Sequence, residues 1–222
     1  MKIQSFNIKK IAKYCAEEVF RANTDAPGFV YLDLGKNLSS YKLREIMVNL
    51  KKELSNFTVN KYDKKLSYHW LVRFDQQVNT PFHIDNAADE SFLMLGYEPS
   101  DISSELYIAD FHKFANDNDI SPKNYLRNFT PIFKEEEALL IPFITKIESF
   151  CKNTYKIVLI NNSKPKPEAK TLGVFHKAQI VSQDLKKSRI VNSMIINMLP
   201  KNKIIENESD ENKFLKTDTI SK

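Results

Sequence analysis

Two histidines and one aspartate have the residue types needed to bind a metal ion. His83 and Asp85 are two positions apart in the segment Thr-Pro-Phe-His83-Ile-Asp85. Side chains at i and i+2 of an extended strand point to the same side, so this imidazole and carboxylate would converge. His176, in Gly-Val-Phe-His176-Lys-Ala, could add a third ligand from a distant strand. Two imidazoles and a carboxylate on one face of a metal leave open positions opposite, as in non-haem Fe(II) sites.

The order of further residues along the chain supports this metal-site hypothesis. A His-x-Asp pair alone is weak, because a chain with four histidines would contain one by chance roughly a quarter of the time. His176, however, lies on a predicted strand 91 residues after Asp85. Arg189 opens the next predicted strand, 13 residues after His176. We therefore predict that these four side chains meet in one pocket.

Composition favours a single β-rich domain. The chain has 222 residues and is 42% hydrophobic, which is enough for one full core. Fifteen Phe and nine Tyr favour sheet over a helical bundle, because aromatic side chains suit pleated surfaces. The four glycines are spaced so that neither a G-x-G-x-x-G loop nor a Walker loop can form. Nucleotide-binding folds that depend on such loops are disfavoured.

The hydrophobic pattern predicts helices at the start of the chain and strands after it. Residues 1–60 read as a helix–strand–helix support, and residues 66–199 as a β core within one domain, 1–199. Short strands with turn signals between them favour a sandwich or barrel. After Pro200 the chain is charged and has few apolar residues, so 200–222 is predicted to be a flexible tail. The expected helices are 7–22, 39–54 and 135–150, and the expected strands are 29–34, 67–75, 81–85, 91–97, 104–111, 155–161, 172–181 and 189–199.

Together, these motifs and Ser-Arg189-Ile-Val-Asn-Ser193 resemble those of the 2-oxoglutarate- and Fe(II)-dependent oxygenases, over about residues 66–199. The resemblance implies a mixed α+β fold dominated by β, a cupin-like double-stranded β-helix (jelly roll) flanked by N-terminal helices. It implies that His83, Asp85 and His176 hold Fe(II), with 2-oxoglutarate and O2 as co-substrates. Arg189 would bind the far carboxylate of 2-oxoglutarate through two parallel hydrogen bonds.

The co-substrate site departs from the family pattern at one position. Many members have Ser or Thr two residues after the arginine, whereas this chain has Val191, and Ser193 is the next residue on that face. Ser193 is therefore assigned to co-substrate binding with Arg189. Weaker candidates are Tyr97 and Tyr107, each of which could instead be a packed aromatic, and Asn161. Asn161 and its neighbour Asn162 end a predicted strand beside the site, where either a pocket role or a turn role is open to them.

The leading functional hypothesis is an enzyme, a hydroxylase that couples 2-oxoglutarate decarboxylation to C–H oxidation. One alternative is a non-catalytic jelly-roll module that binds a metal or another ligand. The other is a nucleic-acid binder, because residues 151–189 carry nine Lys or Arg against two Asp or Glu. That stretch has few aromatics for base stacking, so a nucleic-acid partner is not expected. Its lysines hint weakly at an anionic small molecule or side chain as substrate.

The remaining features suggest a cytoplasmic protein without a membrane partner. Cys15 and Cys151 form neither a metal-like pair nor a disulfide framework. The first residues lack the apolar stretch of a signal peptide. The longest apolar run, 138–144, is far shorter than a membrane span.

Overall fold

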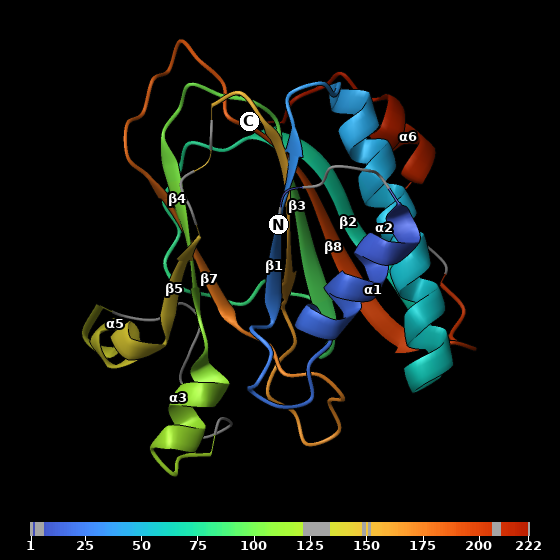
Figure 1. The fold of residues 1–222 in the computed structure, drawn as a ribbon, viewed down its shortest axis with the longest axis vertical. Coiled ribbons are helices and arrows are strands. Elements are labelled where there is room, and N and C mark those ends of the chain that lie inside the picture. The colour runs from blue at the N-terminus through green and yellow to red at the C-terminus, as the bar shows by residue number, and fades with distance from the viewer. Residues whose placement is uncertain are drawn as a thin grey trace.

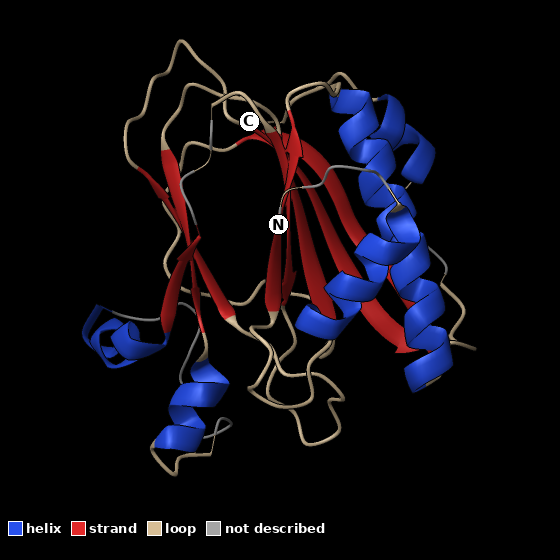
Figure 2. Ribbon diagram, viewed as in Figure 1, coloured by secondary structure: helices blue, strands red, loops and turns tan. Residues whose placement is uncertain are grey.

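Two β-sheets face each other, and helices cover the outer face of the larger sheet (Figure 1 and Figure 2). This arrangement comes from a computed structural model, which describes residues 2, 7–121, 134–147, 150, 152–205 and 210–221. The helices are α1 (Ile8–Val19), α2 (Ser40–Tyr62), α3 (Phe111–Asp117), α5 (Lys134–Leu140) and α6 (Glu211–Lys216), with a 3-10 turn at Ile141–Phe143. The strands are β1 (Phe29–Gly35), β2 (Lys64–Asp75), β3 (Ser91–Tyr97), β4 (Ser104–Ala109), β5 (Ile144–Ile147), β6 (Tyr155–Asn161), β7 (Phe175–Ile180) and β8 (Ile190–Pro200).

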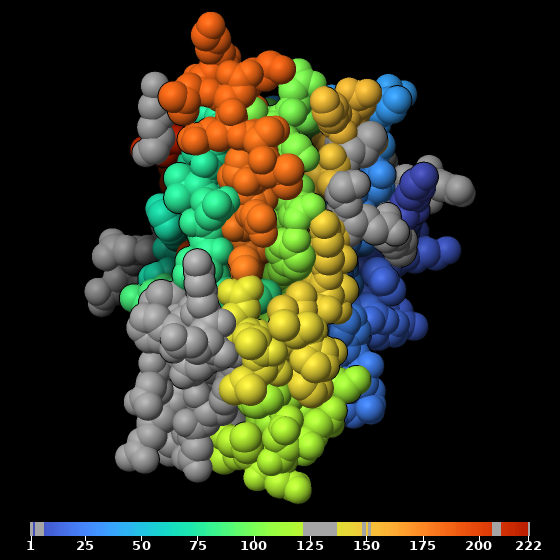
Figure 3. Space-filling view, turned by 90° about the vertical axis from the view of Figure 1, so that its left-hand side faces the viewer, coloured from blue at the N-terminus to red at the C-terminus, as the bar shows by residue number. Residues whose placement is uncertain are grey.

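The larger sheet has the strand order β1-β6-β3-β8-β2, and the smaller has the order β5-β4-β7. All of these pairs are antiparallel. Figure 3 looks onto the smaller sheet, where β7 lies beside β4. His83 extends this sheet beyond β7, because His83 and His176 exchange two main-chain hydrogen bonds of 3.1 Å each.

The path of the chain between the sheets is that of a jelly roll. The chain runs from β2 in the larger sheet to the His83 segment in the smaller one, and back to β3. It then passes through β4 and β5 in the smaller sheet, β6 in the larger, β7 in the smaller and β8 in the larger. Eight segments shared in this way between two facing sheets form a jelly roll. The predicted fold class, a β-dominated jelly roll with N-terminal helices, is confirmed.

Strand alternation divides the apolar side chains into two main cores. On β3, Phe92 and Met94 face the helices, whereas Leu93, Leu95 and Tyr97 face the smaller sheet. The first core lies between the larger sheet and α1, α2 and α6, and the second lies between the two sheets. The second core forms the surroundings of the candidate site.

The helical support also depends on a small residue in the sheet. A Cβ atom on Gly96 would lie 2.4 Å from Sδ of Met47 on α2. Glycine at this position therefore lets α2 pack closely against the larger sheet. Asn7 and Ser39 cap the N-termini of α1 and α2 by accepting hydrogen bonds from main-chain N–H groups, at 3.1 Å in each case.

Three predicted elements differ from the structure. The helix expected over 135–150 ends at Leu140, and a 3-10 turn containing Pro142 leads into β5 instead. The strand expected over 81–85 is reduced to a single bridge at His83. The helix expected over 39–54 continues in α2 as far as Tyr62.

Residues 200–222 were predicted to be a flexible tail. Within 210–221 the structure instead has the helix α6 and a bridge from Ser221 to β2. Phe214 on α6 is 3% exposed and joins the core beneath α2. Arg44 of α2 donates hydrogen bonds to the carbonyl oxygen of Leu215, at 3.1 Å from Nη2. Farther on, Ser221 pairs with the edge of β2, where it accepts a hydrogen bond of 3.1 Å from the N–H of Asp75. One buried aromatic and these hydrogen bonds hold a segment whose composition is that of a free tail.

Among the described residues, no helix is long and apolar enough to cross a membrane.

Candidate metal centre

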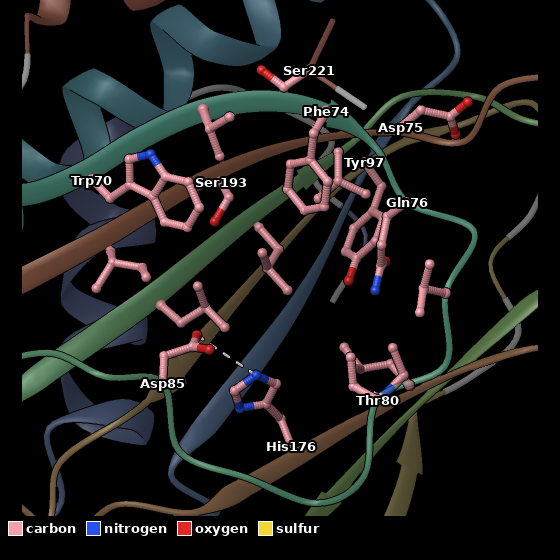
Figure 4. Close-up of a pocket in the computed structure, with 18 of the residues that line it drawn as sticks. Trp70, Phe74, Asp75, Gln76, Thr80, Asp85, Tyr97, His176, Ser193 and Ser221 are labelled. Atoms are coloured by element: carbon pink, nitrogen blue, oxygen red, sulfur yellow. Dashed lines mark hydrogen bonds and ion pairs between the residues drawn. The ribbon is translucent and has the colours of Figure 1, made fainter.

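His83, Asp85 and His176 meet at one end of the space between the sheets. Nε2 of His83 lies 3.3 Å from Oδ1 of Asp85, and Nε2 of His176 lies 3.7 Å from Oδ2 of the same carboxylate. Their possible ligand atoms are all within 4.8 Å of one another. Figure 4 shows Asp85 and His176 turned toward each other. Ligand atoms in cis positions at about 2.1 Å from one ion are about 3 Å apart, so the group needs little movement to share a metal.

Local main-chain contacts hold the three side chains in place. The bridge between His83 and His176 sets the two imidazoles side by side, with ring centroids 4.1 Å apart. The N–H of Asp85 donates to Oδ1 of Asn162 at 2.7 Å, and Nδ2 of Asn162 donates to the carbonyl oxygen of Asp85 at 3.1 Å. Asn162 is completely buried and also donates to Oγ of Ser91, at 2.9 Å. Its amide therefore fixes the main chain of the carboxylate ligand to the larger sheet.

The two imidazoles are held differently. Nδ1 of His83 lies 2.8 Å from the carbonyl oxygen of Pro81, so Nδ1 carries a proton and Nε2, which faces Asp85, is the nitrogen that would bind a metal after losing its own proton. This is the arrangement in which histidines usually bind metals. Nδ1 of His176 is buried and has no hydrogen-bond partner among the residues that the structure describes.

The charges of the group suit a cation. Burial lowers the pKa of His176 to about 4, and His83 acts in the same direction while Asp85 opposes it. Burial acts to raise the pKa of Asp85, but the hydrogen bond from His83 and the charge of His176 hold it below its ordinary value. For His83, burial acts to lower the pKa, whereas Asp85 and the carbonyl of Pro81 raise it overall. A neutral His176 beside an ionised Asp85 supplies the protonation states that metals bind.

A cavity of about 480 Å³ extends from these side chains between the two sheets (Figure 4). Its floor is the inner face of the larger sheet, where β2, β8 and β3 place residues side by side in register. The smaller sheet and the His83 segment form the opposite wall, with Leu106 and Ala178 beside the metal-site group. The floor has three rows, Trp70–Ile195–Leu93, Val72–Ser193–Leu95 and Phe74–Val191–Tyr97.

Arg189 lies behind the third row. Its guanidinium is 4.9 Å from the centre of the Tyr97 ring, and its Nε donates to Oγ of Ser104 at 2.7 Å. Nη1 donates to Oε1 of Gln76. Nη2 is buried without a partner among the described residues. Burial lowers the pKa of Arg189, while Tyr97 and Asp75 raise it, and an arginine remains charged in a protein. A buried cation with an unused donor thus lies next to Gln76 and Tyr97, which line the cavity.

Of the other predicted site residues, some lie on the strand face that lines the cavity and others lie on the opposite face. Ser193 and Tyr97 line the cavity. Tyr107 does not line it, because Leu106 and Ile108 are the inward residues of β4; its hydroxyl donates to Glu105 instead. Asn161 faces α1, where its Nδ2 donates to the carbonyl oxygen of Val19 at 2.8 Å. Neither residue is a site candidate any longer.

Sequence reasoning missed two residues of this region, namely Gln76 and Trp70. Alternation along β2 from Phe74 back to Trp70 could have indicated the latter. The role of Gln76 depends on loop conformation and had no comparable signal.

The lysines of the basic stretch lie outside the cavity. Lys177 pairs with Glu137 at 2.5 Å, and Lys187 pairs with Asp101 at 3.4 Å. None of the described residues that line the cavity is Lys or Arg. The hint that these lysines point to an anionic substrate therefore has no support in the cavity lining.

No family model matches the chain, and no curated protein matches it. Among solved structures, the chain is similar to the Kdo hydroxylase KdoO, a non-heme Fe(II) alphaketoglutarate-dependent dioxygenase, in complex with succinate and Fe(III). The identity is 10%, the TM-score is 0.44, and the match covers 90% of this chain and 88% of that one. KdoO with cobalt(II) gives 10% and 0.42, and KdoO with alphaketoglutarate and Fe(III) gives 9% and 0.39, with the same coverage. These neighbours are of the family that the sequence motifs resemble.

Proposed function

We propose that this chain is an Fe(II)- and 2-oxoglutarate-dependent dioxygenase that hydroxylates a C–H bond of a small substrate. The observation that carries the proposal is the meeting of His83, Asp85 and His176 at a cavity with a buried arginine near it. This arrangement would place a metal at one part of the cavity and a carboxylate-binding cation behind another part of its wall.

The donor set fits Fe(II). Two imidazoles and one carboxylate form a facial triad with open positions for other ligands. The unpartnered Nδ1 of His176 does not oppose this, because its Nε2 is the nitrogen that faces Asp85. Iron held in this way would activate O2 together with the keto acid and oxidise the substrate. The protein's own part is to bind and orient the reactants and to exclude water.

Arg189 fits the far carboxylate of 2-oxoglutarate. Its unused donor Nη2 requires an acceptor, since a buried polar group without a partner is costly. Gln76 and Ser104 hold the guanidinium from the sides, so its direction is set before the ligand arrives. A carboxylate bound here would gain charge-assisted hydrogen bonds in surroundings that contain little water.

The surrounding residues have supporting roles. Asn162 fixes the main chain of Asp85, and the Pro81 carbonyl fixes the tautomer of His83. Phe74, Val191 and Tyr97 form an apolar row beside Arg189, which excludes water from the carboxylate pair. A site of this kind binds its co-substrate by a few polar groups placed in an otherwise apolar cavity.

The proposal is tested by anaerobic addition of Fe(II) and 2-oxoglutarate, which we expect to produce a visible metal-to-ligand charge-transfer band. Replacing His83 by Ala should weaken metal binding by at least ~100-fold and abolish the band, because even outer partners of metal ligands contribute 10–100-fold. The matched control is His69→Ala, since His69 is exposed on β2 and does not line the cavity. On admission of O2, the wild type should convert 2-oxoglutarate to succinate.

Two results would count against the proposal. If the wild type gives no band, or if His83→Ala keeps it, the triad is not the iron site. A band without any O2-dependent succinate would favour the alternative of a non-catalytic jelly-roll module.

A further inference from the structure

We propose that the substrate of this site is a small uncharged molecule that presents an apolar, ring-sized group to the row Trp70–Ile195–Leu93. This inference rests on the proposed function, which assigns the Arg189 end of the cavity to 2-oxoglutarate. It names the chemical class of the molecule that occupies the remaining space.

The cavity is large enough for a second molecule. Ligand cavities of about 300–1,000 Å³ hold drug-sized molecules, and this one measures about 480 Å³. A five-carbon keto acid between the metal-site group and Arg189 would occupy the part lined by Phe74, Val191 and Tyr97. Space would remain over the first row of the floor, at the end where Trp70 opens to solvent. Trp70 is 55% exposed while also lining the cavity, as a residue at the mouth would be.

The surface of this remaining space is apolar. Trp70, Ile195 and Leu93 lie in register across β2, β8 and β3, so their side chains form one continuous strip. In Figure 4 the indole of Trp70 lies on the same side of the cavity as Asp85, away from Gln76 and Tyr97. A flat indole beside two branched aliphatic side chains favours contact with a ring or a branched hydrocarbon group.

Most polar groups of the lining already have partners. Oγ1 of Thr80 accepts from the N–H of Ala178 at 2.9 Å. Oδ1 of Asp75 accepts from the N–H of Arg189 at 2.8 Å, and Oε1 of Gln76 accepts from its guanidinium. Apart from these residues, Tyr97, the indole N–H of Trp70 and the metal-site group, the polar groups of the described lining residues are those of Ser193 and Ser221. A sugar, whose many hydroxyls need partners, would lose more hydrogen bonds to water than it could regain here.

A second anion would also be unfavourable. Within the part of the chain that the structure describes, no Lys or Arg lines the cavity, and the proposed function assigns the adjoining Arg189 to the keto acid. A further carboxylate would have to lose its water in a space that already holds Asp75 and Asp85. Burying a charge without a partner is costly. The lining therefore selects against anions, in contrast to the hint from the basic stretch.

Trp70 itself can report binding, because it is the single tryptophan of the chain. We would titrate the protein, held anaerobically with Fe(II) and saturating 2-oxoglutarate, with pairs of probes that differ in charge. The pairs are benzyl alcohol with benzoate, and cyclohexylmethanol with cyclohexanecarboxylate; D-glucose tests a polar neutral ligand. We expect the alcohols to change the indole emission and to bind at least ~10-fold more tightly than the matched carboxylates, since an unpaired buried charge is penalised. Glucose should cause no change.

A pair of variants tests the charge argument directly. Val78 lines the cavity and is 68% exposed, so Val78→Lys would add a cation at its rim without disturbing the core. We expect the carboxylate probes to bind about 5-fold more tightly to this variant, as for an added charge near the surface. Val181→Lys is the control, because Val181 is 56% exposed and does not line the cavity.

The substrate class and the proposed function can fail separately. If the charge-transfer band is present but the carboxylates or glucose bind as tightly as the alcohols, the substrate class is wrong and the function stands. The substrate class is equally wrong if the band is present and no probe changes the indole emission. If the band is missing, the proposed function is wrong.

Discussion

Arg189 is the residue whose surroundings are hardest to explain without a ligand. It is 3% exposed, three of its groups donate to neighbours, and Nη2 has no acceptor among the described residues. A guanidinium in such a position costs free energy unless an acceptor is supplied. The proposed keto acid carboxylate would supply it.

Replacing Arg189 by Lys keeps the charge but removes the planar fork that can bind a carboxylate at two points. We expect 2-oxoglutarate affinity to fall by at least ~30-fold, because disrupting a buried charge pair costs about 2–5 kcal/mol. Metal affinity should remain within about 3-fold of the wild type, a difference below 1 kcal/mol. Both quantities can be measured by titration of the charge-transfer band and by metal binding without the keto acid.

The control for this variant is Arg73→Lys. Arg73 is an ion-paired arginine on β2 that binds Glu98 and does not line the cavity. Equal losses of metal and keto acid affinity in Arg189→Lys would mean that Arg189 supports the fold and does not bind the co-substrate.

At the scale of elements, α6 shows how a short polar segment can be held in place. Five of its six residues are polar or only partly buried, and Phe214 alone is buried against α2 and the larger sheet. Arg44 and Arg73 then bind carbonyl oxygens at Leu215 and Asp218, at 3.1 Å in each case. These contacts bring Ser221 to the edge of the cavity.

We predict that Phe214→Ala lowers the free energy of unfolding by about 3 kcal/mol. Replacing a buried phenylalanine by alanine costs about 3–5 kcal/mol, and a position in a terminal helix should be at the low end of this range. Chemical denaturation measures this change, and limited proteolysis should show earlier cleavage near the C-terminal segment. Leu185→Ala is the control, since Leu185 is 88% exposed. If both variants are as stable as the wild type, α6 is not packed as the structure has it.

For the whole molecule, a buried neutral histidine makes stability depend on pH. His112 on α3 is 6% exposed, and its ring lies 4.4 Å from that of Phe111. Burial lowers its pKa from 6.5 to about 4, with Arg21 acting in the same direction and Asp110 opposing it. Between these two values the unfolded chain binds more protons than the folded protein. The stability contributed by His112 is therefore complete above pH 6.5 and is lost as the pH falls toward 4.

Replacing His112 by Leu should reduce the loss of unfolding free energy between pH 7 and pH 4 by about 3 kcal/mol, the value of a pKa difference of this size. Denaturant titrations at several pH values, with the metal removed, measure this difference. Leu185→Ala should leave the pH dependence unchanged, because it removes no titratable group and Leu185 is 88% exposed. An unchanged slope in His112→Leu would show that His112 does not titrate in this range.

Features that depend on residues close together in the sequence could be predicted for this protein, whereas features that depend on contacts between distant segments could not. The pairing of His83 with Asp85 is local, since residues two apart on an extended chain share a side. The strands were predicted from their own periodicity, and the order of the motifs along the chain indicated the family resemblance. The predicted helix over 135–150 failed beyond Leu140, where Pro142 interrupts the pattern.

Features that depend on strand register could not be predicted in this way. Tyr97 and Tyr107 looked equivalent in the sequence, but only Tyr97 faces the cavity, because a shift of one residue turns a side chain to the other face of its sheet. The same register decides that Ser193 faces inward and that Asn161 faces α1.

The sequence by itself determined the types of side chain at the site and their order along the chain. Only the tertiary structure brought His176 to within 3.7 Å of Asp85, across 91 residues of sequence, through the main-chain bridge to His83. It also decided that the floor of the cavity is apolar and that the lysines of the basic stretch lie outside it. The physical reason is that hydrophobicity and periodicity act along the chain, whereas pairing between distant strands is selected by the packing of the whole core.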